Sequence, residues 1–406
     1  MSQHSSEITL LLAACRPEPD NRIDPLLQTL ADDIDWTRLI ETSLTHSVAG
    51  LLCNTLLKTD QSLVPEDIRD AAAIFLEQAE RDNQEAADQL VHILITLDDA
   101  GIEAIPFKGP TLAVSTFGKL NLRSFADLDF LIRSNKIEPC LNKLKDAGFK
   151  QNINLTRKQR AAFLSYSGQD VLYGHGTPLE PHWAFAPNTL AINIDYAGIF
   201  QRASKKSFNN SAILSLSPED ELIALCIHGS KENWKKLKWV ADVAWHIRRH
   251  PDMDMQGLFS LSETQGVARM VRTGMILASK LLKETLSDTA RNWIDKDAIA
   301  LKLANHLTNE FFCNPGTEKS VYQLSQYHWA MRERLRDRWR YLFRTVTQPR
   351  ESHFIDVALP DSLFFLYTPY KMLHDYIMLP VWLVAKKARP SRINPEPTPK
   401  DIDAPR

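Results

Sequence analysis

The spacing of apolar residues changes near residue 101, and this change limits the folds open to the chain. Between residues 5 and 100, apolar positions recur about every 3.6 residues, as they do along one face of a helix. The segments IEAIPF and DLDFLI that follow read instead as short strands. A helical period returns at residue 217 and continues to about residue 345. The sequence therefore predicts an α+β fold, with a small mixed sheet between two helical regions.

The changes of period divide the chain into five predicted segments. They are an N-terminal helical region (1–100), an α/β core (101–216), a helical domain (217–345), a C-terminal helical segment that packs on the body (346–389) and a disordered tail (390–406). Within the core, Gly174-His175-Gly176 lies between two short apolar runs, which is typical of a β-hairpin. Ser217 and Pro218 predict a well-defined start for the helix that follows.

Two carboxylates lie in the predicted strand DLDFLI. Because side chains alternate across a strand, Asp127 and Asp129 point to one face, while Leu128 and Phe130 point to the other. Carboxylates this close repel each other, and a divalent cation such as Mg²⁺ or Mn²⁺ relieves the repulsion. With a third carboxylate, such a site serves in-line phosphoryl and nucleotidyl transfer. A solvated strand edge or a structural ion pair is the alternative interpretation of this tripeptide alone.

Candidate anion-binding groups flank the two carboxylates. Lys108-Gly109 follows the first predicted strand and leads into a short helix, where backbone N–H groups and the helix dipole favour anions. Arg123 adds a guanidinium group that matches the geometry of phosphate. Lys108 can equally be a solvated loop residue, and Arg123 the partner in a surface ion pair. Taken together, a cation site beside an anion site predicts a pocket for a metal and a phosphate group.

A third carboxylate is expected on the predicted hairpin. Glu180 lies in the segment TPLEPHWAF, with His182 on the same face of the strand. If this strand pairs near DLDFLI, Glu180 faces Asp127 and Asp129, and Asp170 is the second choice for the role. His182 is then adjacent to the site, or it is a core residue whose ring is satisfied by a backbone group.

A helical segment after the predicted core supplies further candidates. We expect one continuous helix over SKENWKKLKWVADVAWHIRR, with Ser230 as its N-cap. The polar residues within about 60° of one another around this helix are Lys231, Lys235, Lys238 and Asp242. His228 extends this stripe if the helix is unbroken. The stripe is a solvated face, or Lys231 or Lys238 closes over a triphosphate and Asp242 orients the lysine.

Charge, cysteine spacing and hydropathy restrict the partners and the compartment. The chain has 48 basic and 50 acidic residues, so strong nucleic-acid binding is not expected. Its five cysteines show no metal-type spacing, which predicts reduced thiols in a cytoplasmic protein. The most apolar run, YIMLPVWLVA, is too short for a transmembrane helix, which takes roughly 20 residues. It forms a buried helix or a weak contact with a membrane surface.

The motifs described above resemble those of the uncharacterised bacterial nucleotidyltransferases, a family in the DNA polymerase β-like superfamily. They read FKGPTLA, LRSFADLDFLI, LEPHW and SPEDELIALCIHGSKENWKKLKWVADVAWHI. The resemblance covers most of residues 20–250 and weakens to about residue 375. It implies a nucleotidyltransferase core in which Asp127 and Asp129 hold Mg²⁺ and Glu180 is the third acidic position. The family's helical-region motif falls on His228, Trp234, Trp239 and Asp242, which favours a substrate-binding role for that region.

Two parts of the motifs depart from the usual pattern of the superfamily. Lys108-Gly109 stands where the superfamily has Gly-Ser, and the following Pro110 lacks a backbone N–H for a phosphate. Pro181, between Glu180 and His182, suggests a strand edge or a bulge.

The resemblance implies a Mg²⁺-dependent enzyme that moves a nucleotidyl group from an NTP to an unidentified acceptor. Lys108 and Arg123 would contact the phosphates, and Glu180 would activate the acceptor or bind a second cation. Two alternatives stay open. One is a non-catalytic protein that binds a nucleotide or a partner through a degenerate fold of this kind. The other is a metal-dependent glycosyltransferase that uses Asp-x-Asp to hold a sugar nucleotide.

Overall fold

The computed structural model describes residues 5–17, 23–30, 33–151, 153–312 and 321–378. The chain divides into two compact units, which are described in turn. The first comprises Met1–Asn154 and Leu164–Leu342, and the second comprises Leu155–Phe163 and Phe343–Arg406. Every β-strand in the described ranges belongs to the first unit. The predicted core, residues 101–216, is divided between the units, because Leu155–Phe163 belongs to the second.

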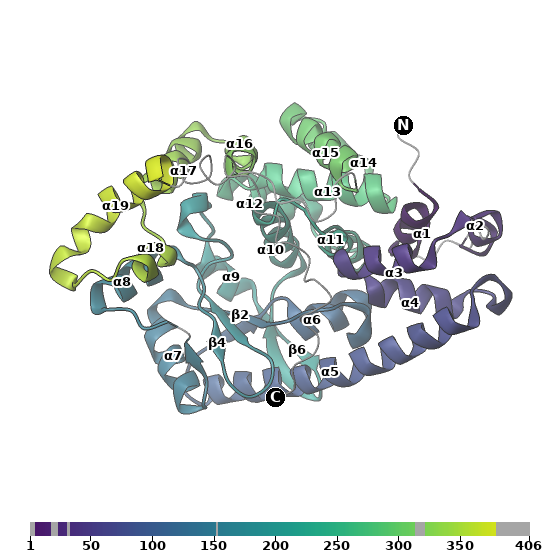
Figure 1. Ribbon diagram of the computed structural model, residues 1–406, viewed down its shortest axis with the longest axis horizontal. Coiled ribbons are helices and arrows are strands. Elements are labelled where there is room, and N and C mark those ends of the chain that lie inside the picture. Colours follow the sequence, from purple (N-terminus) through teal and green to yellow (C-terminus); the bar gives the residue numbers. More distant parts are fainter. Residues whose placement is uncertain (1–4, 18–22, 31–32, 152, 313–320, 379–406) are drawn as a thin grey trace, which may run out of the picture. The chain divides into compact units, whose positions relative to one another are not determined.

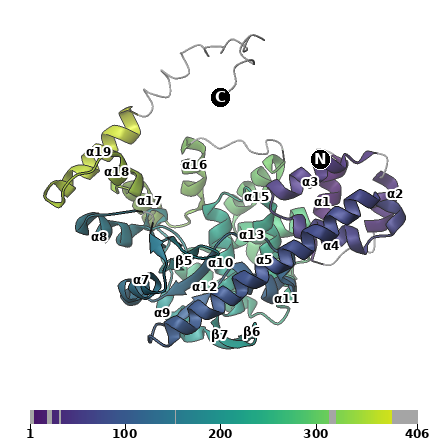
Figure 2. The same ribbon diagram turned by 60° about the horizontal axis from the view of Figure 1, so that its bottom comes forward.

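Helices make up the N-terminal part of the first unit, as the apolar spacing predicts. They are α1 (Ser6–Ala14), α2 (Ile23–Leu30), α3 (Trp36–Thr45), α4 (Ala49–Lys58) and α5 (Glu66–Asp98). Helix α5 is 33 residues long and runs along the first unit as one rod (Figures 1 and 2). It packs against α4 and, further along, against α6 (Gly109–Leu112) and α7 (Ile137–Asp146).

Two of these helices hold the short turn η4 (Leu120–Leu122), which precedes the second strand. Gly50 of α4 lies against the backbone of η4, because a Cβ atom at this position would be 2.4 Å from the carbonyl oxygen of Asn121. Asn83 of α5 donates a hydrogen bond from Nδ2 to the carbonyl oxygen of Leu120 at 2.7 Å. The segment that leads into the second strand is thus fixed by the N-terminal helices.

The core contains a five-stranded mixed sheet, which confirms the predicted α+β class. Its strands are β1 (Ala104–Pro106), β2 (Leu128–Ile132), β3 (Lys150–Gln151), β4 (Leu172–Tyr173) and β5 (Leu179–His182), in the spatial order β1-β2-β5-β4-β3. Strands β2 and β5 run parallel, whereas the other neighbours are antiparallel. The predicted hairpin is confirmed, since β4 and β5 pair on either side of the Gly174-His175-Gly176 turn.

Pro181 does not mark an edge, because β5 lies in the interior of the sheet. The missing N–H is tolerated for a local reason. Strand β4 pairs with β5 only at Leu179. On this side of β5, Pro181 therefore has no paired residue of β4 to which an N–H would have to donate. The carbonyl oxygen of Pro181 still accepts a hydrogen bond from the backbone N–H of Asp170 at 3.1 Å.

A separate two-stranded hairpin follows the sheet. It consists of β6 (Ser204–Phe208) and β7 (Ser211–Ser215) and comes after helix α9 (Tyr196–Arg202). The run AILSL, residues 212–216, reads as a strand in the sequence and corresponds to β7. Strand β6 is not predicted, because four of its five residues are exposed and polar, so it lacks an alternating apolar pattern. Asn209 and Asn210 form its turn with positive φ angles of 46° and 60°, which asparagine tolerates well.

The helical period after residue 217 corresponds to a set of packed helices. They are α10 (Pro218–Lys231), α11 (Leu237–Arg249), α12 (Met255–Gln265), α13 (Ala268–Leu282), α14 (Asp288–Ile294), α15 (Ala298–Glu310), α16 (Val321–Met331) and α17 (Leu335–Thr347). Ser217 caps α10 as predicted, since its side chain accepts a hydrogen bond from the N–H of Asp220. Helices α10, α11 and α13 pack on one another through buried residues such as Leu222, Val240 and Met275.

The continuous helix expected from Ser230 onward is wrong. Helix α10 runs through Ser230 to Lys231, and α11 begins only at Leu237. Between them Trp234 adopts a positive φ of 52° and is 1% exposed. Its indole fills the space beside Gly229, where a Cβ atom would lie 2.4 Å from the ring. Because this large side chain is buried here, the backbone is not helical at Trp234. The spacing of apolar residues in the sequence does not predict this break.

The second unit contains a small core around Tyr367. Helices α18 (Glu351–Asp356) and α19 (Tyr367–Leu373) contribute to it, together with part of α8 (Arg157–Tyr166). The hydroxyl of Tyr367 donates to the carbonyl oxygen of Val357 at 2.7 Å and accepts from the N–H of Leu359 at 2.9 Å. The predicted segment 346–389 is described only as far as residue 378, and the predicted disordered tail lies outside the described residues.

No helix within the described ranges is both long enough and apolar enough to cross a bilayer. The apolar run YIMLPVWLVA, for which two interpretations are open, is described only in its first three residues.

Candidate functional site

Two acidic side chains, Asp129 and Glu180, meet on the two parallel strands, and Asp127 lies just before the first of them. Asp129 and Glu180 are direct partners in the register of β2 and β5, and Asp127 immediately precedes β2. Ligand atoms of Asp129, Glu180 and His182 all lie within 4.8 Å of one another. The pairing predicted for the strand that carries Glu180 is therefore confirmed, although the sequence could not supply its parallel direction.

Asp129 is an ionised carboxylate with two strong donors. It is 2% exposed, and its Oδ1 lies 2.5 Å from Lys108 Nζ and 2.8 Å from His182 Nε2. Burial alone would raise the pKa of Asp129, but the Lys108 charge and the His182 hydrogen bond outweigh it. They hold the pKa of this carboxyl well below its usual range.

Asp127 has the opposite environment. It is half-buried, and its carboxylate forms no hydrogen bond or ion pair with any residue that the structure describes. Burial, together with the negative charges of Asp129 and Glu180, raises the pKa of Asp127 to about 6. Asp127 has no partner and is repelled by two further carboxylates. A bound cation would relieve this repulsion.

Glu180 and not Asp170 lies with the other two acidic residues. Its Oε2 accepts a hydrogen bond from Gln169 Nε2 at 2.7 Å and lies 3.5 Å from His182 Nε2. Asp170 instead binds the side chain of Gln151. Sequence reasoning missed Gln169, because nothing in the local pattern indicates that this loop residue forms a β-bridge with His182.

His182 faces the carboxylates from inside the fold. Its Nε2 points toward Asp129 and Glu180, so this nitrogen must carry a hydrogen. Its Nδ1 lies 3.4 Å from the carbonyl oxygen of Ala184, and its ring packs edge-on against Phe107 at 4.9 Å. At 2% exposure, His182 is placed to orient Asp129 and is hardly accessible to a substrate.

Lys108 follows the end of β1. Because β1 pairs antiparallel with β2, this end lies beside the start of β2, where Asp129 is located. The next residue, Gly109, has a φ of +53°, a left-handed conformation that favours glycine. A Cβ atom at Gly109 would also lie 3.4 Å from the carbonyl oxygen of Asp127. The Lys-Gly dipeptide therefore makes a tight turn that directs a lysine into the acidic cluster. Helix α6, which follows, has only four residues, so Lys108 itself is the main cationic feature here.

Arg123 and Asp242 form a buried ion pair. Arg123 Nε lies 2.8 Å from Asp242 Oδ1, and Arg123 Nη2 lies 3.0 Å from Asp242 Oδ2. Both residues are less than 5% exposed. The geometry differs from the expectation that Asp242 orients a lysine, because this carboxylate is bidentate to Arg123. The pair joins the segment before β2 to helix α11.

The predicted lysine stripe is divided between two helices. Lys231 ends α10 and lies 3.6 Å from Glu232. Lys238 is in α11, where its Nζ donates to the carbonyl oxygen of Ser124 at 3.2 Å. Burial and the charge of Arg123 lower the pKa of Lys238 to about 8. Lys238 is close enough to Asp127 for its charge to act on that carboxyl.

His228 and Trp239 belong to the wall behind the site. Their rings meet edge-on at 5.6 Å. Burial, with the charge of Lys108, holds the pKa of His228 well below its usual value, so this imidazole is neutral. Trp239 is 9% exposed, so it packs in the interior of the first unit and offers little surface to a substrate.

A cavity of about 290 Å³ lies elsewhere in the first unit. Its walls include Arg16, Lys58 and Lys119 around an apolar floor formed in part by Phe117 and Trp245. None of the predicted site residues lines it. The cavity is therefore separate from the acidic cluster.

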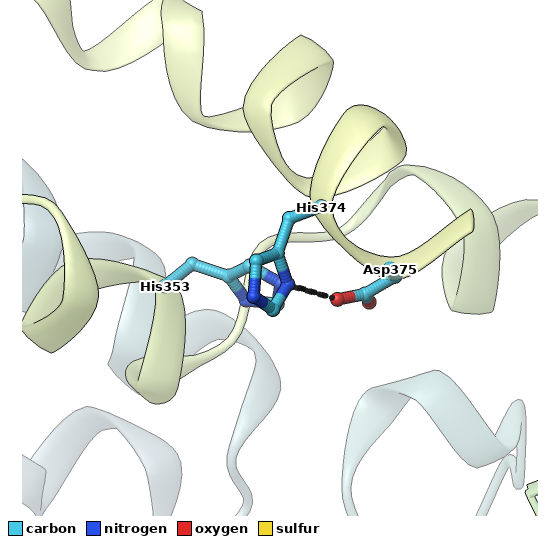
Figure 3. Close-up of side chains that lie close together, drawn as sticks. All are labelled: His353, His374 and Asp375. Carbon is cyan, nitrogen blue, oxygen red and sulfur yellow. Dashed lines mark hydrogen bonds and ion pairs between the residues drawn. The ribbon is translucent and has the colours of Figure 1, made fainter. Parts of the chain in front are cut away.

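A second group of possible metal ligands lies in the second unit and consists of His353, His374 and Asp375 (Figure 3). Nδ1 of His353 accepts a hydrogen bond from the N–H of Arg350 at 3.0 Å, so Nε2 carries the hydrogen and donates to Asp375 Oδ1 at 3.1 Å. A metal on Nε2 would leave this ring without any hydrogen, whereas metal-bound histidines normally donate from the other nitrogen. Lys371 binds the second oxygen of Asp375. The group is a hydrogen-bond network around a carboxylate.

Comparisons with known proteins found one family and a similar solved structure. The sequence model of a family described as uncharacterised nucleotidyltransferase matches residues 32–283. Among solved structures, this chain is similar to an antigenic nucleotidyltransferase-like protein from Paracoccidioides brasiliensis, with 16% identity and a TM-score of 0.30 over 52% of this chain and 97% of that one. No curated protein matches the chain.

Proposed function

Because the chain belongs to the family of uncharacterised nucleotidyltransferases, we propose that it transfers a nucleotidyl group from an NTP to an acceptor and that the reaction depends on Mg²⁺ or Mn²⁺. One observation carries the proposal. Asp129 and Glu180 lie side by side on two adjacent parallel strands, and their charges act on Asp127, which precedes the first strand and has no hydrogen bond or ion pair among the described residues.

The donor set fits a hard divalent cation. All three side chains offer carboxylate oxygens, which are the ligands that Mg²⁺ and Mn²⁺ prefer. Burial and the charges of Asp129 and Glu180 raise the pKa of Asp127, and a bound cation would offset both effects. Bound there, a cation would supply charge neutralisation for an in-line displacement at phosphorus.

The remaining groups have roles that follow from their positions. Lys108 is the ammonium nearest the carboxylates, and it suits a phosphate contact. Lys238 lies on the helical side of Asp127 and adds a second positive charge there. Arg123 is committed to Asp242 and so acts by fixing the segment before β2, not by direct contact with a phosphate. Glu180 is the candidate to activate an acceptor or to hold a second cation.

The replacement Asp127→Asn tests the proposal. It keeps the size of the side chain and removes the charge that the cation needs. With MgATP or another Mg–NTP at about 100 times its Kd, the wild type should gain about 2.7 kcal/mol of stability in a thermal unfolding assay. The variant should gain much less, and label transfer from α-labelled NTPs should fall by at least about 100-fold. The exposed Asp288→Asn serves as the matched control, since the Asp288 side chain is 91% exposed.

The ion pair between Lys108 and Asp129 supports a second candidate function. A lysine on a carboxylate of the cluster is also consistent with a protein that binds a nucleotide without transferring it. Stabilisation by Mg–NTP without label transfer to any acceptor would favour this binding function. Stabilisation by UDP-sugars but not by NTPs would instead favour the glycosyltransferase alternative.

A further inference from the structure

Helix α17 carries a row of large apolar side chains on a face that is open to solvent. At 100° per residue, these side chains lie within an arc of about 100° around the helix axis. The opposite side of the helix is the buried one, where Asp337 and Tyr341 are located. The exposed apolar side chains are those of Leu335 (69%), Trp339 (63%), Leu342 (41%) and Phe343 (68%).

Such exposure is concentrated in the C-terminal part of the described chain. Six exposed large apolar side chains precede residue 300, whereas 13 lie between Leu335 and Met378. The second unit contributes several of its own, including Phe365, Ile377 and Met378. Because an apolar face of this kind is costly to leave in water, it indicates a surface that meets a partner.

Arginines border the apolar face of α17. Arg336 and Arg340 follow it around the helix, and their side chains are 56% and 48% exposed. Both lie near the same carboxylate, that of Asp337, at 3.4 Å and 3.8 Å. Asp337 is buried and is the one acidic residue of α17. Residues 334–350 contain six arginines against this single aspartate, so the region is strongly basic in a chain of balanced charge.

The partner that fits both properties is a membrane surface with anionic lipids. Helices that lie in the membrane interface place Trp, Phe and Leu at the boundary of the acyl chains, while basic side chains pair with the headgroups. A second copy of α17 would cover the apolar face but would bring arginines together without an exposed acidic residue on either helix. A nucleic acid would pair with the arginines but would leave the apolar side chains in water.

We propose that α17 binds in the interface of membranes that contain anionic phospholipids. Leu335, Trp339 and Phe343 enter the boundary of the acyl chains, and Arg336 and Arg340 contact lipid phosphates. The helix lies along the surface, because its 13 residues are too few to cross a hydrocarbon core of about 30 Å. This inference uses no residue of the acidic cluster and is independent of the nucleotidyl transfer proposed above.

Flotation with lipid vesicles tests the inference on the full chain. Vesicles of equal parts phosphatidylglycerol and phosphatidylcholine should bind the wild type at least about tenfold more tightly than phosphatidylcholine vesicles. The double variant Trp339→Ser/Phe343→Ser should bind the anionic vesicles at least about tenfold more weakly. The double variant Arg336→Gln/Arg340→Gln should lose about tenfold on anionic vesicles and nothing on neutral ones.

Matched controls separate this face from general stickiness and charge. Ile74→Ser removes an apolar side chain that is 67% exposed on α5, and Arg291→Gln removes an arginine side chain that is 58% exposed on α14. Each should change the affinity for anionic vesicles by less than about twofold, because both lie outside the proposed contact. All replaced side chains are exposed, so every variant should fold, and thermal unfolding checks this.

Three outcomes would overturn the inference. In the first, the wild type does not bind anionic vesicles, or the two α17 variants bind them as tightly as the wild type does. In the second, the wild type ignores vesicles but self-associates in analytical ultracentrifugation, and Trp339→Ser/Phe343→Ser is monomeric, so a second copy covers the face. In the third, the wild type binds single-stranded DNA in place of vesicles, and Arg336→Gln/Arg340→Gln loses this binding. Asp127→Asn should bind vesicles like the wild type, which keeps the two proposals separate.

Discussion

At the scale of single residues, burial decides which groups carry charge, and Glu221 is a clear case outside the acidic cluster. It lies buried in α10, with Oε2 3.5 Å from His246 Nδ1. Burial raises the pKa of Glu221 to about 7 and lowers the pKa of His246 to about 3. Nε2 of His246 donates to the carbonyl oxygen of Pro218 at 2.9 Å, so Nδ1 is an acceptor. A protonated Glu221 supplies the donor that this nitrogen faces.

The replacement Glu221→Gln should stabilise the protein at alkaline pH. The folded protein keeps a proton on Glu221 that the unfolded chain, with a usual carboxyl pKa of 4.5, has released. The free energy of unfolding therefore falls as the pH rises from about 5 to about 7 and stays low above this range. Glutamine keeps a donor for His246 and removes the loss, which is roughly 2.5 kcal/mol between pH 5 and pH 8.

Urea unfolding at pH 5 and at pH 8 checks this prediction. The advantage of Glu221→Gln over the wild type should be larger at pH 8 by that amount. An equal difference at the two pH values would show that the folded protein holds Glu221 ionised.

At the scale of elements, the ion pair between Arg123 and Asp242 connects the segment before β2 to helix α11. The pair is bidentate and lies in the interior of the first unit. The charge of Asp242 outweighs burial, so the pKa of Arg123 is raised. Neither residue touches the acidic cluster, but Asp127 lies only four positions after Arg123. The orientation of Asp127 thus depends on a contact with a helix that comes more than a hundred residues later.

Removing one member of this pair should be much worse than removing both. Asp242→Leu or Arg123→Met alone leaves the other charge of the pair buried and uncompensated and should cost about 3–5 kcal/mol of stability. The double variant Arg123→Met/Asp242→Leu should recover a large part of this loss. Chemical unfolding of the four proteins gives the coupling free energy. Additive losses would mean that the two charges do not depend on each other.

At the scale of the whole molecule, the chain forms two compact units with separate cores. The acidic cluster and its supporting residues belong to the first, whereas Tyr367 is the centre of the second. Tyr367 is fully buried, and its hydroxyl also accepts a hydrogen bond from Gln159 Nε2 at 2.8 Å. This single oxygen therefore satisfies three polar groups, two from the loop after α18 and one from α8.

The replacement Tyr367→Phe should act on the second unit alone. It leaves the groups bound by the hydroxyl without a partner, at a cost of about 1–3 kcal/mol. Amide hydrogen exchange should accelerate in α18 and α19, while protection of β2 and β5 stays the same. Binding of a metal–nucleotide complex should not change. Faster exchange in β2 would instead indicate that the two units unfold together.

Local patterns in the sequence predict a large part of this structure. The alternation of side chains along a strand places Asp127 and Asp129 on one face, and the hairpin signal at Gly174 brings Glu180 onto a paired strand. These inferences need only neighbouring residues. The change of helical period likewise predicts the mixed sheet between two helical regions.

Contacts between distant charges could not be predicted in the same way. From the sequence, Lys108 and Arg123 are both plausible phosphate ligands because of their charge. Only the fold shows that Lys108 forms an ion pair with Asp129 and Arg123 with Asp242. Trp234 illustrates the same limit for the backbone. Its positive φ follows from burial beside Gly229, a tertiary contact that overrides the local preference for helix.

The close approach of Gly50 to the turn η4 has a consequence for attempts to shorten the protein. A fragment that begins at residue 101 would keep every strand and every acidic residue of the cluster. It would nevertheless lose the backbone surface that supports Asn121 and the amide of Asn83 that holds Leu120. The minimal folding piece that preserves the cluster therefore includes α4 and α5, and the N-terminal helices cannot be trimmed away as an accessory.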